Sequence, residues 1–273
     1  MDKKKDQFIA LCADNRDDAE QLLPVAKTLA ASLKKDIILF TCSPDGDCWV
    51  ETLGIPFAAI KSDWPTVVEA MPTAFNVILA LTLIDNSAPR TSPSHPHQIL
   101  KNFRNSKIAY LLLPKKSPLI IHHSSFTTVL TLDHQRESKE KLLWASYLQR
   151  FCNSPVTIFH HPYTDTTLRN HLDNNIRYLD KIFSSFNLTY ILQSLPPGNQ
   201  FANPDLHAVK TLVYLSTYQS INPIIFISLV PDPRDRDLFD ILSSSPALRL
   251  IKKAPSLPIL FLNQRDDLYI LCD

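Results

Sequence analysis

The sequence predicts an α/β protein built from two tandem, doubly wound parallel sheets. Short apolar segments alternate with amphipathic helical segments, which is typical of parallel strands joined by helices. The same order of parts occurs twice, because residues 8–33 and 126–151 each contain an apolar strand, an aspartate, a charged turn and a helix. A chain of 273 residues is long enough for two such domains.

The two halves keep the same spacing beyond the first helix. Asp14 lies 23 residues before Ile37 in the strand IILF, and Asp133 lies 23 residues before Val156 in VTIF. Agreement over this distance indicates an internal repeat of one unit. The predicted organisation is a first domain at residues 1–114, a linker at 115–125 and a second domain at 126–273.

In the first domain the helix after Asp14 follows from apolar residues at helical spacing from Leu22 to Leu33. Asp17 and Asp18 are expected to cap its start. The elements expected after it are a strand at 37–42, a turn at 43–47, a strand at 53–60, a helix at 64–71, a buried strand at 76–83, a loop at 85–97, a helix at 97–103 and a strand at 107–114.

In the second domain the clearest helix runs from Leu168 to Phe186, where apolar residues recur in steps of three and four. An earlier helix carries Leu143, Tyr147 and Phe151. The other elements expected are strands at 126–132, 156–162, 188–195, 223–230 and 257–263, a helix at 206–218 and an extra strand at 267–272.

The composition excludes several classes of function. Lys and Arg number 28 and Asp and Glu number 27, which gives a formal charge of +1. The chain therefore lacks the excess of positive charge that is typical of nucleic-acid-binding proteins. Five cysteines at irregular spacing form neither a zinc motif nor a redox motif. The apolar runs are far shorter than the roughly 20 residues of a membrane span. We expect a cytoplasmic protein with reduced thiols that binds neither nucleic acid nor membrane.

Glycine is rare in this chain. There are three glycines, Gly46, Gly54 and Gly198, beside 21 prolines. Loops that hold phosphate use glycine to bring backbone amides close to the ligand. The chain therefore has few places where such a loop can form.

Two aspartates are the best candidates for a ligand pocket. Asp14 and Asp133 follow the first strand of each half, at the carboxyl end where open α/β sheets bind ligands. The alternative is that each aspartate only caps the turn into the next helix. The tryptophans, Trp64 among them, are expected to be packing residues.

Histidines raise the question of a metal site. His134, His160 and His161 follow neighbouring strands and can converge, but no accompanying ligand set is visible in the sequence. We therefore predict no metal site and interpret these histidines as polar residues at strand ends.

Taken together, the strands ending in Asp14 and Asp133, the helices after them, and the last strands after proline-flanked segments resemble the universal stress protein family in tandem form. The resemblance covers residues 7–113 and 126–263. It implies a five-stranded parallel sheet of order 3-2-1-4-5 in each unit, as in adenine-nucleotide α-hydrolases. In members that bind ATP, this aspartate faces the adenine pocket and a glycine-rich loop after the fourth strand holds the phosphates.

Both halves depart from that pattern. The segments after the fourth strands, residues 84–98 and 231–245, contain no glycine, and their prolines remove amide donors. The second segment also carries four aspartates against two arginines, which repel phosphate. The resemblance therefore implies a regulatory or interaction protein of stress adaptation that binds no ATP, needs no cofactor and is not an enzyme. It also implies an unidentified protein partner, pairing of the two units within the chain, and a homodimer as a further arrangement.

A second hypothesis stays open beside this one. The chain is then a signalling module that binds a nucleotide or another small ligand, with Asp14 or Asp133 on the base and Arg90 or Arg234 on a charged tail. An enzyme of the adenine-nucleotide α-hydrolase group ranks last, because the phosphate loop that its chemistry needs is missing.

Overall fold

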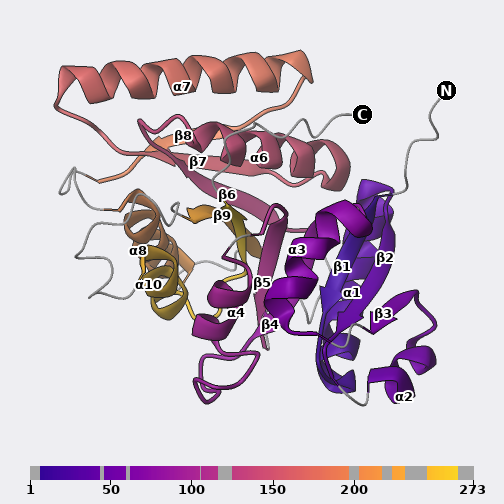
Figure 1. The fold of residues 1–273 in the computed structure, drawn as a ribbon. Coiled ribbons are helices and arrows are strands. Elements are labelled where there is room, and N and C mark those ends of the chain that lie inside the picture. The colour runs from indigo at the N-terminus through magenta and orange to yellow at the C-terminus, as the bar shows by residue number, and fades with distance from the viewer. Residues whose placement is uncertain are drawn as a thin grey trace. The chain divides into compact units, whose positions relative to one another are not determined.

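The structure of this chain is a computed structural model, drawn in Figure 1. The chain divides into two compact units, Met1–His123 (unit 1) and Ser124–Asp273 (unit 2). Most of the segment predicted as a linker, 115–125, lies outside the described residues. The structure describes residues 7–43, 46–59, 62–104, 106–115, 125–196, 203–216, 223–230 and 245–263.

Unit 1 contains five parallel strands in the order β3-β2-β1-β4-β5. Its elements are β1 (Phe8–Cys12), α1 (Arg16–Leu33), β2 (Asp36–Thr41), α2 (Gly46–Val50), the 3-10 helix η1 (Glu51–Leu53), β3 (Phe57–Ala59), α3 (Trp64–Ala74), β4 (Val77–Ile84), α4 (Pro96–Asn102) and β5 (Ala109–Pro114).

Unit 2 contains five parallel strands in the order β8-β7-β6-β9-β10. Counted from its own start, each unit thus has the order 3-2-1-4-5, which confirms the predicted fold. The elements of unit 2 are β6 (Thr127–Leu132), α6 (Ser138–Cys152), β7 (Val156–His160), α7 (Thr166–Ser185), β8 (Ile191–Ser194), α8 (Pro204–Ser216), β9 (Ile224–Val230), α10 (Pro246–Lys253) and β10 (Ile259–Asn263).

Helices cover the strands of each unit on both sides. In unit 2, α6 packs against α7, α8 packs against α10, and Figure 1 shows the two pairs on opposite sides of the strands. In unit 1, α1 packs on β1, β2 and β4, while α3 packs against α4. Strands covered on both faces need an uninterrupted apolar sequence, and every residue of β4 is accordingly buried.

The start of α1 differs from the prediction that Asp17 and Asp18 cap it. Asn15 is the N-cap residue, and its side-chain oxygen accepts a hydrogen bond from the Asp18 backbone nitrogen. The aspartates lie in the first turn, where their charge suits the positive end of the helix dipole. Asn15 is the cap because its backbone is extended, which places its side-chain oxygen next to the unpaired backbone amides of that turn.

Helix α7 confirms the strongest helical pattern of the sequence. Asp165 caps its start by accepting a hydrogen bond from the Leu168 backbone nitrogen. Leu172, Leu179 and Phe183 are buried along one side. The periodic apolar stripe therefore specified the packed face of the helix.

Among the described residues, the sequence prediction missed three short helices, namely α2, η1 and α10. Helix α10 begins after Ser245, whose hydroxyl accepts a hydrogen bond from the Leu248 backbone nitrogen, and has Pro246 in its first turn. The helix has only eight residues, and the sequence before it, residues 231–245, is rich in proline and aspartate and is typical of a loop. The extra strand expected at 267–272 lies outside the described residues.

Helices that could serve as membrane spans were sought in the described part of the chain. None of them combines the required length with a sufficiently apolar sequence.

Candidate functional site

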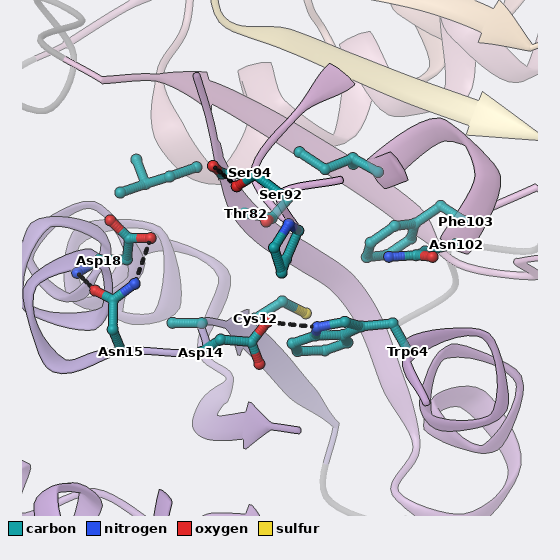
Figure 2. Close-up of a pocket in the computed structure, with 14 residues that line it drawn as sticks. Cys12, Asp14, Asn15, Asp18, Trp64, Thr82, Ser92, Ser94, Asn102 and Phe103 are labelled. Atoms are coloured by element: carbon teal, nitrogen blue, oxygen red, sulfur yellow. Dashed lines mark hydrogen bonds between the residues drawn. The ribbon is translucent and has the colours of Figure 1, made fainter. Parts of the chain in front are cut away.

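The strand order of unit 1 reverses between β1 and β4, which is where open α/β sheets form a crevice for ligands. Cys12 on β1 pairs with Thr82 on β4 at this point. Both residues line a cavity of about 140 Å³, shown in Figure 2. The cavity lies entirely within unit 1, at the position that the sequence predicted for a pocket.

Asp14 lies in the wall of this cavity and connects two other segments of unit 1. Its Oδ1 accepts a hydrogen bond of 3.1 Å from the Cys42 backbone nitrogen, and its Oδ2 accepts one of 2.8 Å from Trp64 Nε1. The carboxylate therefore does not cap α1. Trp64, predicted to be a packing residue, is instead a partner of Asp14 and a lining residue of the cavity (Figure 2).

A second carboxylate lines the cavity from the first turn of α1. Asp18 accepts a hydrogen bond of 3.0 Å from Asn15 Nδ2 and forms an ion pair of 3.1 Å with Lys115 Nζ. The Lys115 side chain is 36% exposed, so solvent weakens the attraction between the two charges. The ion pair offsets the charge of Asp18 at the edge of the cavity.

The remaining walls are a mixture of hydroxyl groups and aromatic rings. Ser92 and Ser94, on the loop after β4, lie with their hydroxyl oxygens 3.0 Å apart. Phe103 follows α4 and, with Trp64, gives the cavity its aromatic surface (Figure 2). The cavity can therefore contact both a polar group and a flat apolar group.

The pKa values of the two thiols near Asp14 are raised. Burial raises the pKa of the Cys12 thiol well above its usual value, and the charge of Asp14 adds to this effect. Burial, followed by the charges of Asp14 and Asp63, raises the pKa of Cys42 to about 12. Since the thiolate is the reactive form, the raised pKa values disfavour a nucleophilic role for either cysteine.

Asp133, the corresponding aspartate of unit 2, has a different role. Its Oδ1 accepts hydrogen bonds from the Gln135 backbone nitrogen, at 2.9 Å, and from the Ser138 hydroxyl. Asn175 on α7 donates to the backbone oxygens of both Asp133 and Gln135, each at 2.8 Å. Asp133 thus organises the turn into α6, as the alternative interpretation of the sequence proposed.

The switch point of unit 2, between β6 and β9, is filled by a buried polar cluster. Lys141 Nζ lies 3.5 Å from Asp205 Oδ1 and donates a hydrogen bond of 2.9 Å to Thr131 Oγ1. Asp205 also accepts hydrogen bonds from the hydroxyls of Thr131 and, at 2.5 Å, Ser228. All four side chains are buried, so every charge in the cluster depends on its partners.

The cluster stands at the positions that line the cavity in unit 1. Counted from the aspartate after each first strand, Thr131 corresponds to Cys12. By strand register, Ser228 on β9 corresponds to Thr82 on β4. One switch point therefore contains a cavity, and the other contains an internal ion pair.

Histidines gather near this end of unit 2. His134 Nδ1 lies 3.0 Å from the Tyr163 hydroxyl, and the rings of His161 and His207 are 6.3 Å apart. Burial is the main cause that lowers the pKa of both His160 and His207. Within the described ranges, no group of three or more His, Cys, Asp or Glu side chains is arranged to hold a metal ion.

The two arginines of the ligand-binding hypothesis do not join Asp14 among the described contacts. Arg90 is exposed on the loop after β4, is not a lining residue of the cavity, and accepts a hydrogen bond at its backbone oxygen from Gln98. Arg234 lies outside the described residues.

Sequence reasoning missed Lys141 and Asp205. A signal for Lys141 existed, because it shares the helical stripe of Ser138, Ala145 and Leu148, all of which are buried. Asp205 resembles an ordinary acidic residue in the first turn of a helix. Its contact with a lysine 64 residues earlier follows only from the strand order.

Comparison with known proteins rests on structure alone. No protein-family model and no curated protein matches the sequence. Among solved structures, the chain is similar to a functionally unknown protein from Pseudomonas aeruginosa PAO1, with a TM-score of 0.64, 11% identity, and coverage of 95% of this chain and 93% of that one.

Two further structures extend this likeness. A universal stress protein from Archaeoglobus fulgidus DSM 4304 has a TM-score of 0.59 and 12% identity, with 95% of this chain and 97% of that chain covered. The cytoplasmic domain of a prokaryotic cation chloride cotransporter has a TM-score of 0.56 and 14% identity, with 96% of this chain and 98% of that chain covered. The chain therefore has the fold of the universal stress proteins, as its resemblance to that family implied.

Proposed function

We propose that this chain is a regulatory protein of the universal stress protein type that does not bind ATP and acts by contacting another protein. The observation that supports this most directly is the buried Lys141–Asp205 pair, which occupies the switch point of unit 2. A nucleotide needs that crevice to be open. In unit 2 the space is taken by side chains of the chain itself.

Unit 1 also lacks the features that a nucleotide needs. Its cavity of about 140 Å³ is smaller than the roughly 300–1,000 Å³ of most ligand pockets. Two carboxylates, Asp14 and Asp18, line it, and the loop after β4 has no glycine. Triphosphate would meet negative charge in place of a cradle of backbone amides.

The regulatory role follows from the fold and from the absence of a recognisable reaction centre in the sequence. One structural neighbour is the cytoplasmic domain of a cotransporter, so this fold also occurs as one part of a larger protein. We infer a cytoplasmic protein of stress adaptation that works without a cofactor or catalysis. Pairing of the two units within the chain, with or without a homodimer, would leave outer helices for the partner.

Titration with nucleotides tests the proposal. The purified chain is titrated with ATP, ADP and AMP, with and without magnesium, by calorimetry and by thermal unfolding. We expect no binding heat and no change in Tm at millimolar nucleotide. A ligand present at 100 times its Kd stabilises the folded state by about 2.7 kcal/mol, so micromolar binding would be visible and would contradict the proposal.

A second candidate is supported by the cavity of unit 1. In this alternative the chain is a signalling module that binds a small ligand beside Asp14, whose carboxylate lies in the cavity wall. Asp133 is a weaker candidate than Asp14, because its carboxylate is engaged by the turn into α6. Ligand-dependent thermal stabilisation that is lost in Asp14→Asn would favour this candidate, whereas the same loss in Asp133→Ala alone would not.

A further inference from the structure

Unit 2 shows which chemical group this chain itself places at a switch point. The Lys141 ammonium nitrogen lies 2.9 Å from Thr131 Oγ1 and 3.5 Å from Asp205 Oδ1. The buried ammonium group of Lys141 therefore contacts one hydroxyl oxygen and one carboxylate oxygen. This arrangement provides an internal comparison for the cavity of unit 1.

Unit 1 supplies no such cation from its own helix. The position of α1 that corresponds to Lys141 is Leu22, which is buried and apolar. The residues that line the cavity include two aspartates but no lysine, arginine or histidine. The wall of the unit 1 cavity therefore carries carboxylates without a cation among its lining residues.

The charge balance of the cavity favours a cation. Asp18 is offset by Lys115, but among the described residues Asp14 contacts only N–H donors and forms no ion pair. Each carboxylate oxygen can accept more than one hydrogen bond, so Asp14 retains acceptor capacity. Asp14 thus has no ion-pair partner among the described residues.

The size and the aromatic surface restrict the ligand further. An engineered protein cavity of about 150 Å³ binds benzene, so a cavity of about 140 Å³ has room for one ring. Trp64 and Phe103 contribute aromatic rings, which attract a cation by their faces and an apolar group by contact. A single small ligand can use both properties.

We propose that the unit 1 cavity binds a small organic cation, namely a primary ammonium group carried on one ring or a short alkyl chain. The proposal rests on the ligand-binding candidate above and names its ligand class. Asp14 binds the ammonium group, and Ser92 and Ser94 contribute hydroxyl groups to the wall of the same cavity. Trp64 and Phe103 contact the apolar part of the ligand.

The test compares three probes of nearly equal shape, which are benzylammonium, benzyl alcohol and benzoate. Calorimetry on the full chain at neutral pH should give a millimolar or tighter Kd for benzylammonium, as expected for a ligand of this size. Benzyl alcohol should bind about tenfold more weakly, and benzoate should not bind. Equal binding of all three probes, or no binding of benzylammonium, would overturn the proposal.

Variants assign the binding to the cavity. Asp14→Asn should weaken benzylammonium about tenfold, because the amide keeps the shape but removes the charge. Asp17→Asn is the matched control, since Asp17 is an exposed acid three residues after Asp14, in the first turn of α1, and does not line the cavity. An equal loss in both variants would indicate general charge attraction and contradict the proposed site.

A direct readout covers the case in which Asp14→Asn does not fold. In the NMR spectrum of the unaltered chain, benzylammonium should shift the indole N–H signal of Trp64 and leave those of Trp49 and Trp144 in place. The Trp64→Phe variant identifies the signal. If benzylammonium shifts only the Trp144 indole signal, or no indole signal, the proposed site is refuted. Binding of ATP would refute only the proposal that the chain binds no nucleotide.

Discussion

The Lys141 ammonium nitrogen lies 3.5 Å from a carboxylate oxygen of Asp205, and both side chains are buried in unit 2. Removing one member of a buried ion pair leaves an uncompensated charge. We expect Asp205→Asn to lower the free energy of unfolding by about 3–5 kcal/mol, measured by urea denaturation.

The pair as a whole contributes less than this single substitution suggests. The double variant Lys141→Met/Asp205→Leu should recover part of the loss, because apolar side chains of similar volume remove both charges. Full recovery is not expected, since the hydroxyls of Thr131 and Ser228 lose their acceptor. A double variant less stable than Asp205→Asn would contradict this account of the cluster.

Trp64 is expected to stabilise unit 1 through its indole N–H. The Trp64→Phe variant keeps an aromatic ring but removes the donor to Asp14 Oδ2. We expect the free energy of unfolding to fall by about 1–2 kcal/mol. Trp49→Phe serves as the control, because the Trp49 indole donates no hydrogen bond to any described residue. Equal effects of the two substitutions would show that ring packing, and not the hydrogen bond, is responsible.

Asn175 should be essential to the turn after β6. Its amide group donates to two backbone oxygens, those of Asp133 and Gln135, and the side chain is buried. Asn175→Ala should cost about 2–3 kcal/mol of stability, because both acceptors stay buried without this donor. The neighbouring Asn174 is exposed on the same helix, so Asn174→Ala should change the stability by less than about 0.5 kcal/mol.

Acid should destabilise unit 2 through its histidines. Burial lowers the pKa of His160 and of His207 in the folded state, so the unfolded state binds protons more readily. Their contribution to stability is complete above the ordinary histidine pKa of about 6.5 and is lost as the pH falls through the folded-state values. The Tm should therefore drop between neutral and mildly acidic pH.

Substitution separates this effect from general acid denaturation. In His160→Gln/His207→Gln, the change of Tm across that pH range should be smaller than in the unaltered chain. His171→Gln is the control, because His171 is exposed on α7. A pH profile of Tm that is identical in all three proteins would contradict the role of these two imidazoles.

Much of the fold was predictable because its signals are local. The uninterrupted apolar run of β4 and the periodic stripe of α7 each identify an element without knowledge of its neighbours. The strand order came from the resemblance to a known family, and the structure confirms it. Helix α10 escaped prediction because eight residues beside an acidic, proline-rich segment give too little periodicity.

The candidate site was only half predictable. Asp14 was found from its place at the end of a strand, but the indole of Trp64 comes from 50 residues later in the chain. The different roles of Asp14 and Asp133 could not be read from two similar strands, because they depend on Ser138 and Gln135 in one unit and Trp64 in the other. Such contacts are decided by tertiary packing.

The ion pair of Lys141 and Asp205 also bears on the stoichiometry of the proposed ligand binding. Because unit 2 fills its own crevice, a response through the unit 1 cavity has a stoichiometry of one per chain. Occupancy then rises along a simple hyperbola with ligand concentration. A chain with two open crevices could instead show cooperative or biphasic saturation.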